Sequence, residues 1–183
     1  MGPHDGHAPS AAAPISAPEG PVRWVAIAAS TSLGAGFLPW APGTWGSAFA
    51  VAIFVLFSPM PVWLLVASGL ALCALGVWSA DVSEAVFERT DDGRIVIDEV
   101  VGQLLTLAPL RMLFGPEQAG QEFFWLVTGF VAFRVLDIAK PGPVGWVERH
   151  TSGGFGVMAD DVVAGAIAAL VLALALFATG SVG

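Results

Sequence analysis

Two pairs of adjacent acidic residues stand beside apolar segments in a chain that otherwise avoids charge. The pairs are Asp98-Glu99 and Asp160-Asp161. Removing a carboxylate from water costs several kcal/mol unless a cation or a hydrogen-bond donor compensates it. Four such groups beside hydrophobic helices therefore predict a partner, and Mg²⁺ is a hard cation that prefers carboxylate oxygens. We expect all four acids to bind the metal and to be catalytic.

Each pair is followed by a glycine one helical turn later, Gly102 after Asp98 and Gly165 after Asp161. Residues four apart lie on the same helix face, so each acid has a position without a side chain beside it. The spacing predicts two helices that cross closely and bring the acids together. The alternative is that acids near helix starts merely favour the helix dipole and cap backbone N–H groups.

The composition indicates an integral or tightly membrane-associated protein. The 183-residue chain is 56% hydrophobic and only 12% charged, whereas soluble domains are about 25% charged. No charged residue occurs between Trp24 and Ala80 or after Asp161. The net charge of −8 argues against a nucleic-acid partner, because no basic stripe is available to neutralise phosphates. An acidic protein that acts on an anionic lipid needs cations, which again favours magnesium as the cofactor.

The pattern of apolar segments predicts an all-α bundle of about six helices. Residues 1–20 are rich in Ala, Pro, Gly and Ser and predict a disordered tail, which leaves one helical domain over residues 21–183. Period-two alternation is brief and confined to residues 94–97, so strands have little support. The expected helices are 22–38, a helix capped by Thr44 or Ser47 and ending near 57, 62–88, 97–113, 121–139, a short one at 143–149, and 159–178. A glycine-rich loop is expected at 151–156 and another loop at 115–116.

Two of these segments, 62–79 and 162–179, are long enough to cross a bilayer. Six of the seven basic residues lie between them. By the positive-inside rule, the intervening part of the chain is then cytoplasmic.

Four sequence motifs stand in a recognisable order over about residues 30–170. They are Pro39-x-Ala-Pro-Gly-Thr-Trp-Gly-Ser47, Ile95-Val-x-Asp-Glu-x-x-Gly102, Phe133-Arg-x-x-Asp-x-x-Lys-Pro-x-Pro143 and Gly153-Gly-x-Gly-x-Met-x-Asp-Asp-x-x-Ala-Gly165. Together they resemble the phosphatidylglycerophosphatase A family. The resemblance implies a Mg²⁺-dependent enzyme of the bacterial inner membrane that removes the terminal phosphate from phosphatidylglycerol phosphate. It also implies a helical bundle in which one helix is surrounded by others.

The chain departs from the family pattern at two positions. Ile97 stands where the family commonly has Trp, and Ser152 stands where it often has His. His150 lies two residues before Ser152, and we give it no catalytic role.

The third motif places Arg134, Asp137 and Lys140 on about one helix face. We expect Arg134 and Lys140 to contact the substrate phosphate, with Lys140 also catalytic, and Asp137 to bind the metal or orient a neighbour. The alternative is a salt-bridged surface stripe, which contributes little to stability.

Two glycine-containing segments are predicted to bind the substrate. The hydroxyls of Thr44 and Ser47, with the backbone N–H groups of a helix start, make one phosphate site. Gly153 and Gly154 offer a second one. The alternative for both segments is a plain turn between helices.

The sequence therefore predicts a lipid phosphatase of the inner membrane, with its active site facing the cytoplasm and an anionic phospholipid as its substrate. The motifs of cysteine and aspartyl phosphatases are absent, so direct attack by a metal-activated water is the simplest mechanism. The alternative is a small membrane transporter or a membrane-complex subunit, because carboxylates inside membranes also mark ion pathways.

Overall fold

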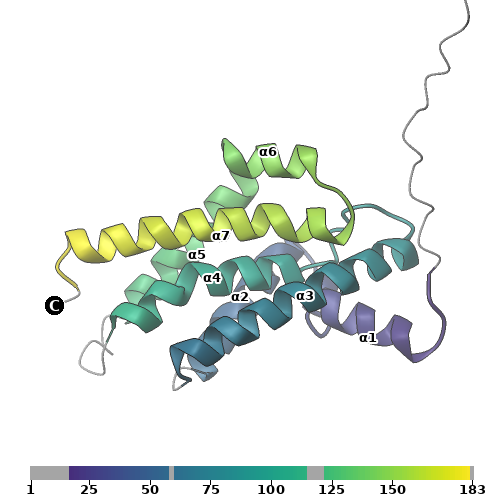
Figure 1. Cartoon of the computed structure of the whole chain (residues 1–183), viewed down its shortest axis with the longest axis horizontal. Helices are drawn as coiled ribbons and strands as arrows, with labels where there is room; N and C mark the ends of the chain where they lie inside the picture. Colours follow the sequence, from purple (N-terminus) through teal and green to yellow (C-terminus); the bar gives the residue numbers. More distant parts are fainter. Residues whose placement is uncertain (1–16, 58–59, 115–121, 182–183) are drawn as a thin grey trace, which may run out of the picture.

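The computed structural model describes residues 17–57, 60–114 and 122–181, which form a bundle of seven α-helices (Figure 1). The elements are α1 (Pro21–Ser30), the 3-10 helix η1 (Ala35–Phe37), α2 (Pro42–Leu56), α3 (Val62–Phe87), α4 (Ile97–Leu113), α5 (Glu122–Ala139), α6 (Pro143–His150) and α7 (Gly153–Ala178). No strand occurs within these ranges, which confirms the predicted all-α fold. Most of the predicted tail and the loop at 115–116 lie outside the described residues.

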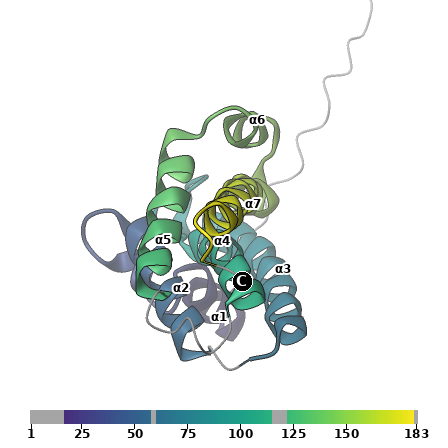
Figure 2. The same ribbon diagram turned by 90° about the vertical axis from the view of Figure 1, so that its left-hand side faces the viewer.

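Helix α4 is the centre of the bundle. It packs against α7, α2, α5 and α3, and the end-on view shows α4 beneath α7, with α3 on one side and α5 on the other (Figure 2). Nine of its 17 residues are buried. The largest apolar cluster consists of Ala50, Phe54, Val100, Leu104, Leu107, Leu110, Trp125, Leu172 and Leu176. The expectation of one helix surrounded by others is therefore confirmed, with four helices around α4.

Helices α4 and α7 approach most closely at Gly102 and Gly165. A Cβ atom on Gly165 would overlap the carbonyl group of Gly102, and a Cβ on Gly102 would lie 2.7 Å from the carbonyl oxygen of Asp161. The hydroxyl of Thr106 ties the crossing together, because it donates to the carbonyl oxygens of Gly102 at 2.9 Å and Gly165 at 3.3 Å. The predicted close crossing at these two glycines is confirmed.

The chain enters α4 through a turn that an ion pair holds in place. The buried Asp92 carboxylate accepts hydrogen bonds from the backbone N–H of Arg94 at 3.0 Å and from its Nε at 2.7 Å. These hydrogen bonds hold the pKa of Asp92 below its usual range. The N–H of Val96 then donates to the Ser30 carbonyl at 2.8 Å. The first turn of α4, which carries Asp98, is thereby attached to α1.

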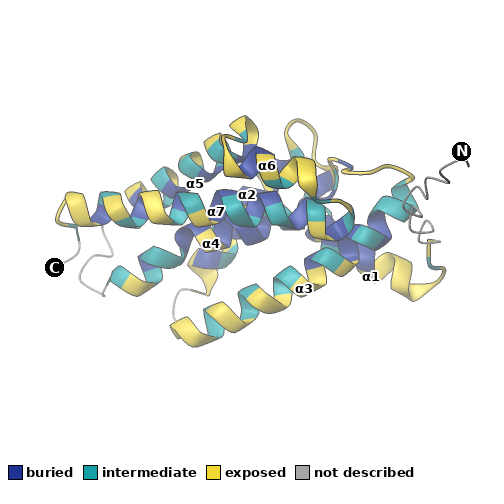
Figure 3. Ribbon diagram, turned by 45° about the horizontal axis from the view of Figure 1, so that its top comes forward, coloured by how far each residue is buried: buried dark blue, intermediate teal, exposed yellow. Residues whose placement is uncertain are grey.

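Two of the described helices are long and apolar enough to cross a membrane. The most apolar 18-residue windows of α3 and α7 have mean hydropathies of 2.0 and 2.4. The part of α3 that begins at Val62 lies largely outside the core (Figure 3). Large apolar side chains are exposed on both helices, among them Trp63, Leu70, Leu170, Leu174 and Phe177. Exposed apolar surface of this extent indicates membrane association.

Helix α7 begins earlier than the sequence predicted. Residues 153–156 form its first turn, so the expected glycine-rich loop is absent from this part of the chain. The Asp81 carboxylate of α3 accepts a hydrogen bond from the N–H of Gly154 and so stabilises this turn. As a result, Asp160 and Asp161 lie two turns inside the helix, and the prediction that this pair opens a helix is wrong.

The end of α1 and the start of α2 also differ from the prediction. The helix expected over 22–38 ends at Ser30. Helix α2 begins at Pro42, whose fixed φ suits a first helical position. The residue before it, Ala41, adopts a left-handed conformation with a φ of 53°. Thr44 and Ser47 therefore lie inside the helix, and neither caps it with its side chain.

The glycine crossing yields a prediction about stability. Replacing Gly165 by Ala should force α4 and α7 apart and lower the stability by about 1–3 kcal/mol, the usual cost of overpacking a core. Thermal unfolding in detergent measures the change. Gly69→Ala is the matched control, because a Cβ on Gly69 meets nothing within 4 Å and alanine favours a helix interior. Equal melting temperatures for Gly165→Ala and the wild type would contradict the crossing.

Candidate active site

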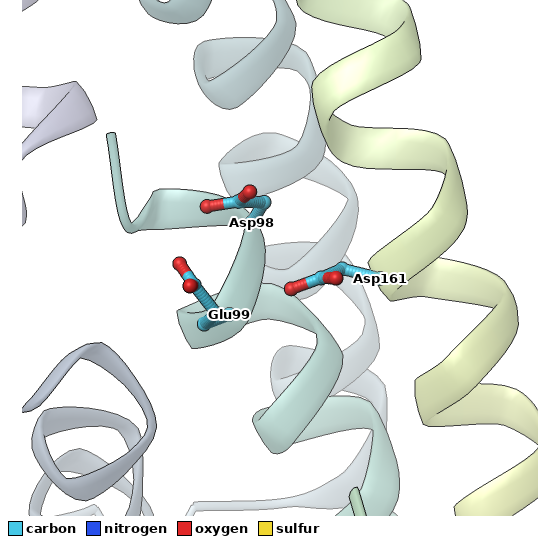
Figure 4. A group of neighbouring side chains, drawn as sticks. All are labelled: Asp98, Glu99 and Asp161. Atoms are coloured by element: carbon cyan, nitrogen blue, oxygen red, sulfur yellow. The ribbon is translucent and has the colours of Figure 1, made fainter. Parts of the chain in front are cut away.

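Three carboxylates meet between the first turn of α4 and the third turn of α7 (Figure 4). Asp98 and Glu99 come from α4, and Asp161 comes from α7. One oxygen atom of each side chain lies within 4.8 Å of the others. The structure thus brings together three of the four acids that the sequence singled out.

The protein compensates the charge of these three carboxylates only in part. Oδ1 of Asp98, Oε2 of Glu99 and Oδ2 of Asp161 are buried and have no hydrogen-bond partner among the described residues. Burial raises the pKa of Asp98 well above its usual value, and the charges of Glu99 and Asp161 raise it further. Burial also raises the pKa of Glu99. Such a cluster requires a cation to hold all three groups ionised at neutral pH.

Helix α5 adds an arginine and a fourth carboxylate at the edge of the cluster. Nη1 of Arg134 lies 2.6 Å from Oδ2 of Asp137 and 3.8 Å from Oε1 of Glu99. The buried Asp137 is also close enough to Asp161 for the two carboxylates to repel each other. One guanidinium therefore lies near several carboxylates, and the net charge of the site stays negative. Nε of Arg134 is buried without a hydrogen-bond partner within the described parts of the chain.

The start of α2 lies directly over these groups. A Cβ atom on Gly43 would overlap Oε1 of Glu99 and would lie 3.0 Å from Nη1 of Arg134. A side chain at position 43 would therefore displace the Glu99 carboxylate from its place at the site. Its first turn brings the positive end of a helix dipole to the site. Thr44 is half-buried in the same turn.

Ser47 lies one turn further along α2, and its hydroxyl is not available to bind a phosphate. It is fully buried, and its hydroxyl donates to the Gly43 carbonyl at 3.0 Å. The hydroxyl is thus used within its own helix.

Asp160 and Lys140 form a separate group. Nζ of Lys140 lies 2.8 Å from Oδ2 of Asp160 and 2.7 Å from Oε1 of Glu148. Neighbouring residues of a helix point about 100° apart, so Asp160 faces this pair while Asp161 faces α4. Gly153 lines a cavity of about 140 Å³ beside Asp160 and Glu148. The N–H of Gly154 is already bonded to Asp81.

The positions that depart from the family pattern lie outside the carboxylate cluster. Ile97 is buried in the core, and Ser152 is exposed before α7. His150 is exposed, stacks on the ring of Trp146 and contacts the Trp146 carbonyl through Nδ1 at 2.7 Å.

Sequence reasoning missed two residues near the site. Gly43 belongs to the first of the four motifs, and its place after Pro42 at a helix start was the available signal. Gln103 is fully buried in α4, and neither amide atom has a hydrogen-bond partner among the described residues. The sequence feature that could have revealed Gln103 is its polar side chain one turn after Glu99 in an otherwise apolar stretch.

The uncompensated charge predicts that the site costs stability when no metal is present. Replacing Asp98 by Asn should raise the melting temperature in a chelating buffer, because one of three buried like charges is removed. Thermal unfolding in EDTA measures this effect. Glu88→Gln, at an exposed position, is the control and should change little. A lower melting temperature for Asp98→Asn would show that the charge is already compensated.

Comparison with known proteins identifies the family. The family model described as phosphatidylglycerophosphatase A matches residues 28–176. Over 145 residues the chain is 37% identical to phosphatidylglycerophosphatase A of Escherichia coli (strain K12), and the match covers 78% of each chain. It is 31% identical over 153 residues to phosphatidylglycerophosphatase A of Haemophilus influenzae, with 83% of this chain and 86% of that protein covered.

A third relative carries another name. Over 155 residues the chain is 34% identical to a Bacteroides thetaiotaomicron protein named "Putative phosphatidylinositol-3-phosphatase", with 82% of this chain and 92% of that protein covered. No solved structure matches the chain. With a family match over residues 28–176 and three such relatives, the chain belongs to the phosphatidylglycerophosphatase A family and is a lipid phosphatase.

Proposed function

We propose that this protein hydrolyses the terminal phosphate of phosphatidylglycerol phosphate in a Mg²⁺-dependent reaction, giving phosphatidylglycerol and inorganic phosphate. The names of the family and of two relatives support this substrate. The observation that carries the proposal is the cluster of Asp98, Glu99 and Asp161 with Arg134 beside it.

The chemistry of the cluster fits a magnesium ion. Mg²⁺ prefers carboxylate oxygens and keeps waters for exchange with substrate phosphate. Asp98, Glu99 and Asp161 would hold the ion, since each has a buried oxygen without a hydrogen-bond partner in the described residues. Asp137 would take part at the edge, where Arg134 fixes its carboxylate. A bound Mg²⁺ would polarise the phosphate oxygens and lower the pKa of water.

The substrate phosphate would lie between Arg134 and the start of α2. Arg134 has a buried Nε with no hydrogen-bond partner in the described chain, and a guanidinium binds phosphate through several donors at once. The backbone around Gly43 and the hydroxyl of Thr44 are close to Arg134 and offer further donors at a positive helix end. In this arrangement the chain's own residues orient the phosphate and exclude bulk water.

We assign Lys140 and Asp160 a positioning role, in which their ion pair holds other parts of the site in place. Each is engaged with the other, and Lys140 also with Glu148. The pair fixes the turn between α5 and α6 against α7, and thereby the last turn of α5, which carries Asp137. A direct phosphate contact by Lys140 would require the lysine to leave both carboxylates.

We place the enzyme in the bacterial cytoplasmic membrane, with its site toward the cytoplasm. Membrane association is supported by α3 and α7. Among the basic residues, Arg94 lies in the turn before α4, Arg134 lies at the carboxylate cluster and Lys140 pairs with Asp160. Arg111 lies at the opposite end of α4, where it pairs with Glu122 at 3.3 Å. This asymmetry agrees with the positive-inside rule.

The first test is an assay with two lipids. Purified protein in mixed micelles should release phosphate from phosphatidylglycerol phosphate when Mg²⁺ is added, and should release much less from phosphatidylinositol 3-phosphate, the lipid that the Bacteroides relative's name suggests. A transporter would release none from either. Preference for the inositol lipid would overturn the proposed substrate while leaving the enzyme class intact.

Asp161→Asn tests the metal site. Loss of a ligand should lower the turnover rate by at least about 10²-fold, because the interaction acts on the transition state. Circular dichroism should show unchanged helical content. Glu122→Gln, at the start of α5 where it pairs with Arg111 of α4, should keep near-normal turnover. Full activity of Asp161→Asn across a Mg²⁺ titration would remove Asp161 from the site.

Lys140→Met and Asp160→Asn test the positioning role. If the two residues act as a pair, each variant should lower the turnover rate by a similar factor, and the double variant should be little worse than either one. Steady-state kinetics of the three variants measures this coupling. A larger rise in KM for Lys140→Met, with additive losses in the double variant, would instead indicate direct phosphate contact by the lysine.

A further inference from the structure

We propose that an apolar groove along the outer side of α5 is the docking surface for an acyl chain of the lipid substrate, with the phosphate end of the lipid at Arg134. This inference rests on the proposed function, since it assigns a place to the substrate's hydrocarbon part.

The groove follows one face of α5. It has a volume of about 350 Å³ and is lined by Phe130, Val131, Arg134, Val135, Ile138 and Ala139. These residues recur at intervals of four along the helix, so they form a continuous stripe. Val131, Val135 and Ile138 are 52%, 57% and 71% exposed. Apolar side chains exposed in a row need an apolar partner to cover them.

Arg134 joins this groove to the carboxylate cluster. It lines the groove, yet its Nη1 atom lies 2.6 Å from Asp137 and 3.8 Å from Glu99. A long basic side chain can lay its apolar stem along hydrocarbon and direct its charged end elsewhere. Arg134 is also the only basic residue between Glu122 and Ala139. The side chain of Arg134 therefore borders both the groove and the carboxylate cluster.

Charge complementarity selects a phospholipid as the occupant. A phospholipid has an anionic head directly attached to hydrocarbon, and the groove has a guanidinium directly attached to an apolar stripe. The start of α2 lies beside Arg134 at Gly43 and adds a second feature that favours an anion. A helix from a second copy of this chain would cover the stripe but would bring no anion to Arg134.

The test compares two substrates that differ only in their acyl chains. Val131→Thr/Val135→Thr keeps the shape of both side chains and makes the stripe polar. For long-chain phosphatidylglycerol phosphate, kcat/KM should fall by at least about tenfold through a higher KM, since small changes in an apolar site have effects of this size. For the dihexanoyl form below its micellar concentration, which has less hydrocarbon to bind, kcat/KM should fall by a clearly smaller factor, and the remaining turnover also shows that the variant is folded. Val171→Thr on α7, 50% exposed, is the matched control and should behave as wild type on both.

The possible outcomes separate the two proposals. If the wild type hydrolyses neither form, the proposed function fails and the acyl-chain site fails with it. If the wild type is active and the double variant loses activity equally on both substrates, or on neither, the proposed function stands and the acyl-chain site is overturned. If the variant alters only the oligomeric state in detergent, measured by light scattering, the groove holds a second copy and the acyl-chain site is again overturned.

Discussion

The contact between α4 and α7 at Gly102 and Gly165 is the constraint on which the site depends. Each glycine lies one turn after an acid, and neither position has room for a side chain. Backbone contact at this level sets the distance between Asp98 and Asp161, which are remote in the sequence. The buried apolar cluster on α4 and the far part of α7 then hold the two helices in register. The same contact between the two glycines therefore determines both the packing of the helices and the geometry of the site.

The same crossing concentrates negative charge where the protein supplies few compensating groups. Arg134 contacts two acids, yet buried oxygens of Asp98, Glu99 and Asp161 have no partner among the described residues. Burying such groups opposes folding, so the apolar core must offset their cost. Sites that need a bound cation commonly have this character, because function and stability place opposite demands on the same residues.

The sequence predicted the parts of the fold and site that depend on local spacing. Helix α4 was expected over 97–113, and the acid-to-glycine spacing correctly indicated the crossing. It did not separate Asp160 from Asp161, because which of two adjacent residues faces α4 depends on how α7 packs. The start of α7 was misplaced for a similar reason. Glycines disfavour helices, but Asp81 stabilises this turn from α3, through a contact that no local pattern reveals.

The position of the site relative to the apolar surface follows from the chemistry of a phospholipid. The head group of such a substrate stays at the polar boundary while its chains stay in hydrocarbon, so an enzyme that acts on the head needs polar and apolar surfaces in contact. Arg134 makes that contact on α5, since it borders both the exposed apolar stripe and the buried acids. Asp160 lies outside the cluster and is paired with Lys140. Asp98, Glu99 and Asp161 keep an excess of negative charge, and it is there that the proposed Mg²⁺ would bind.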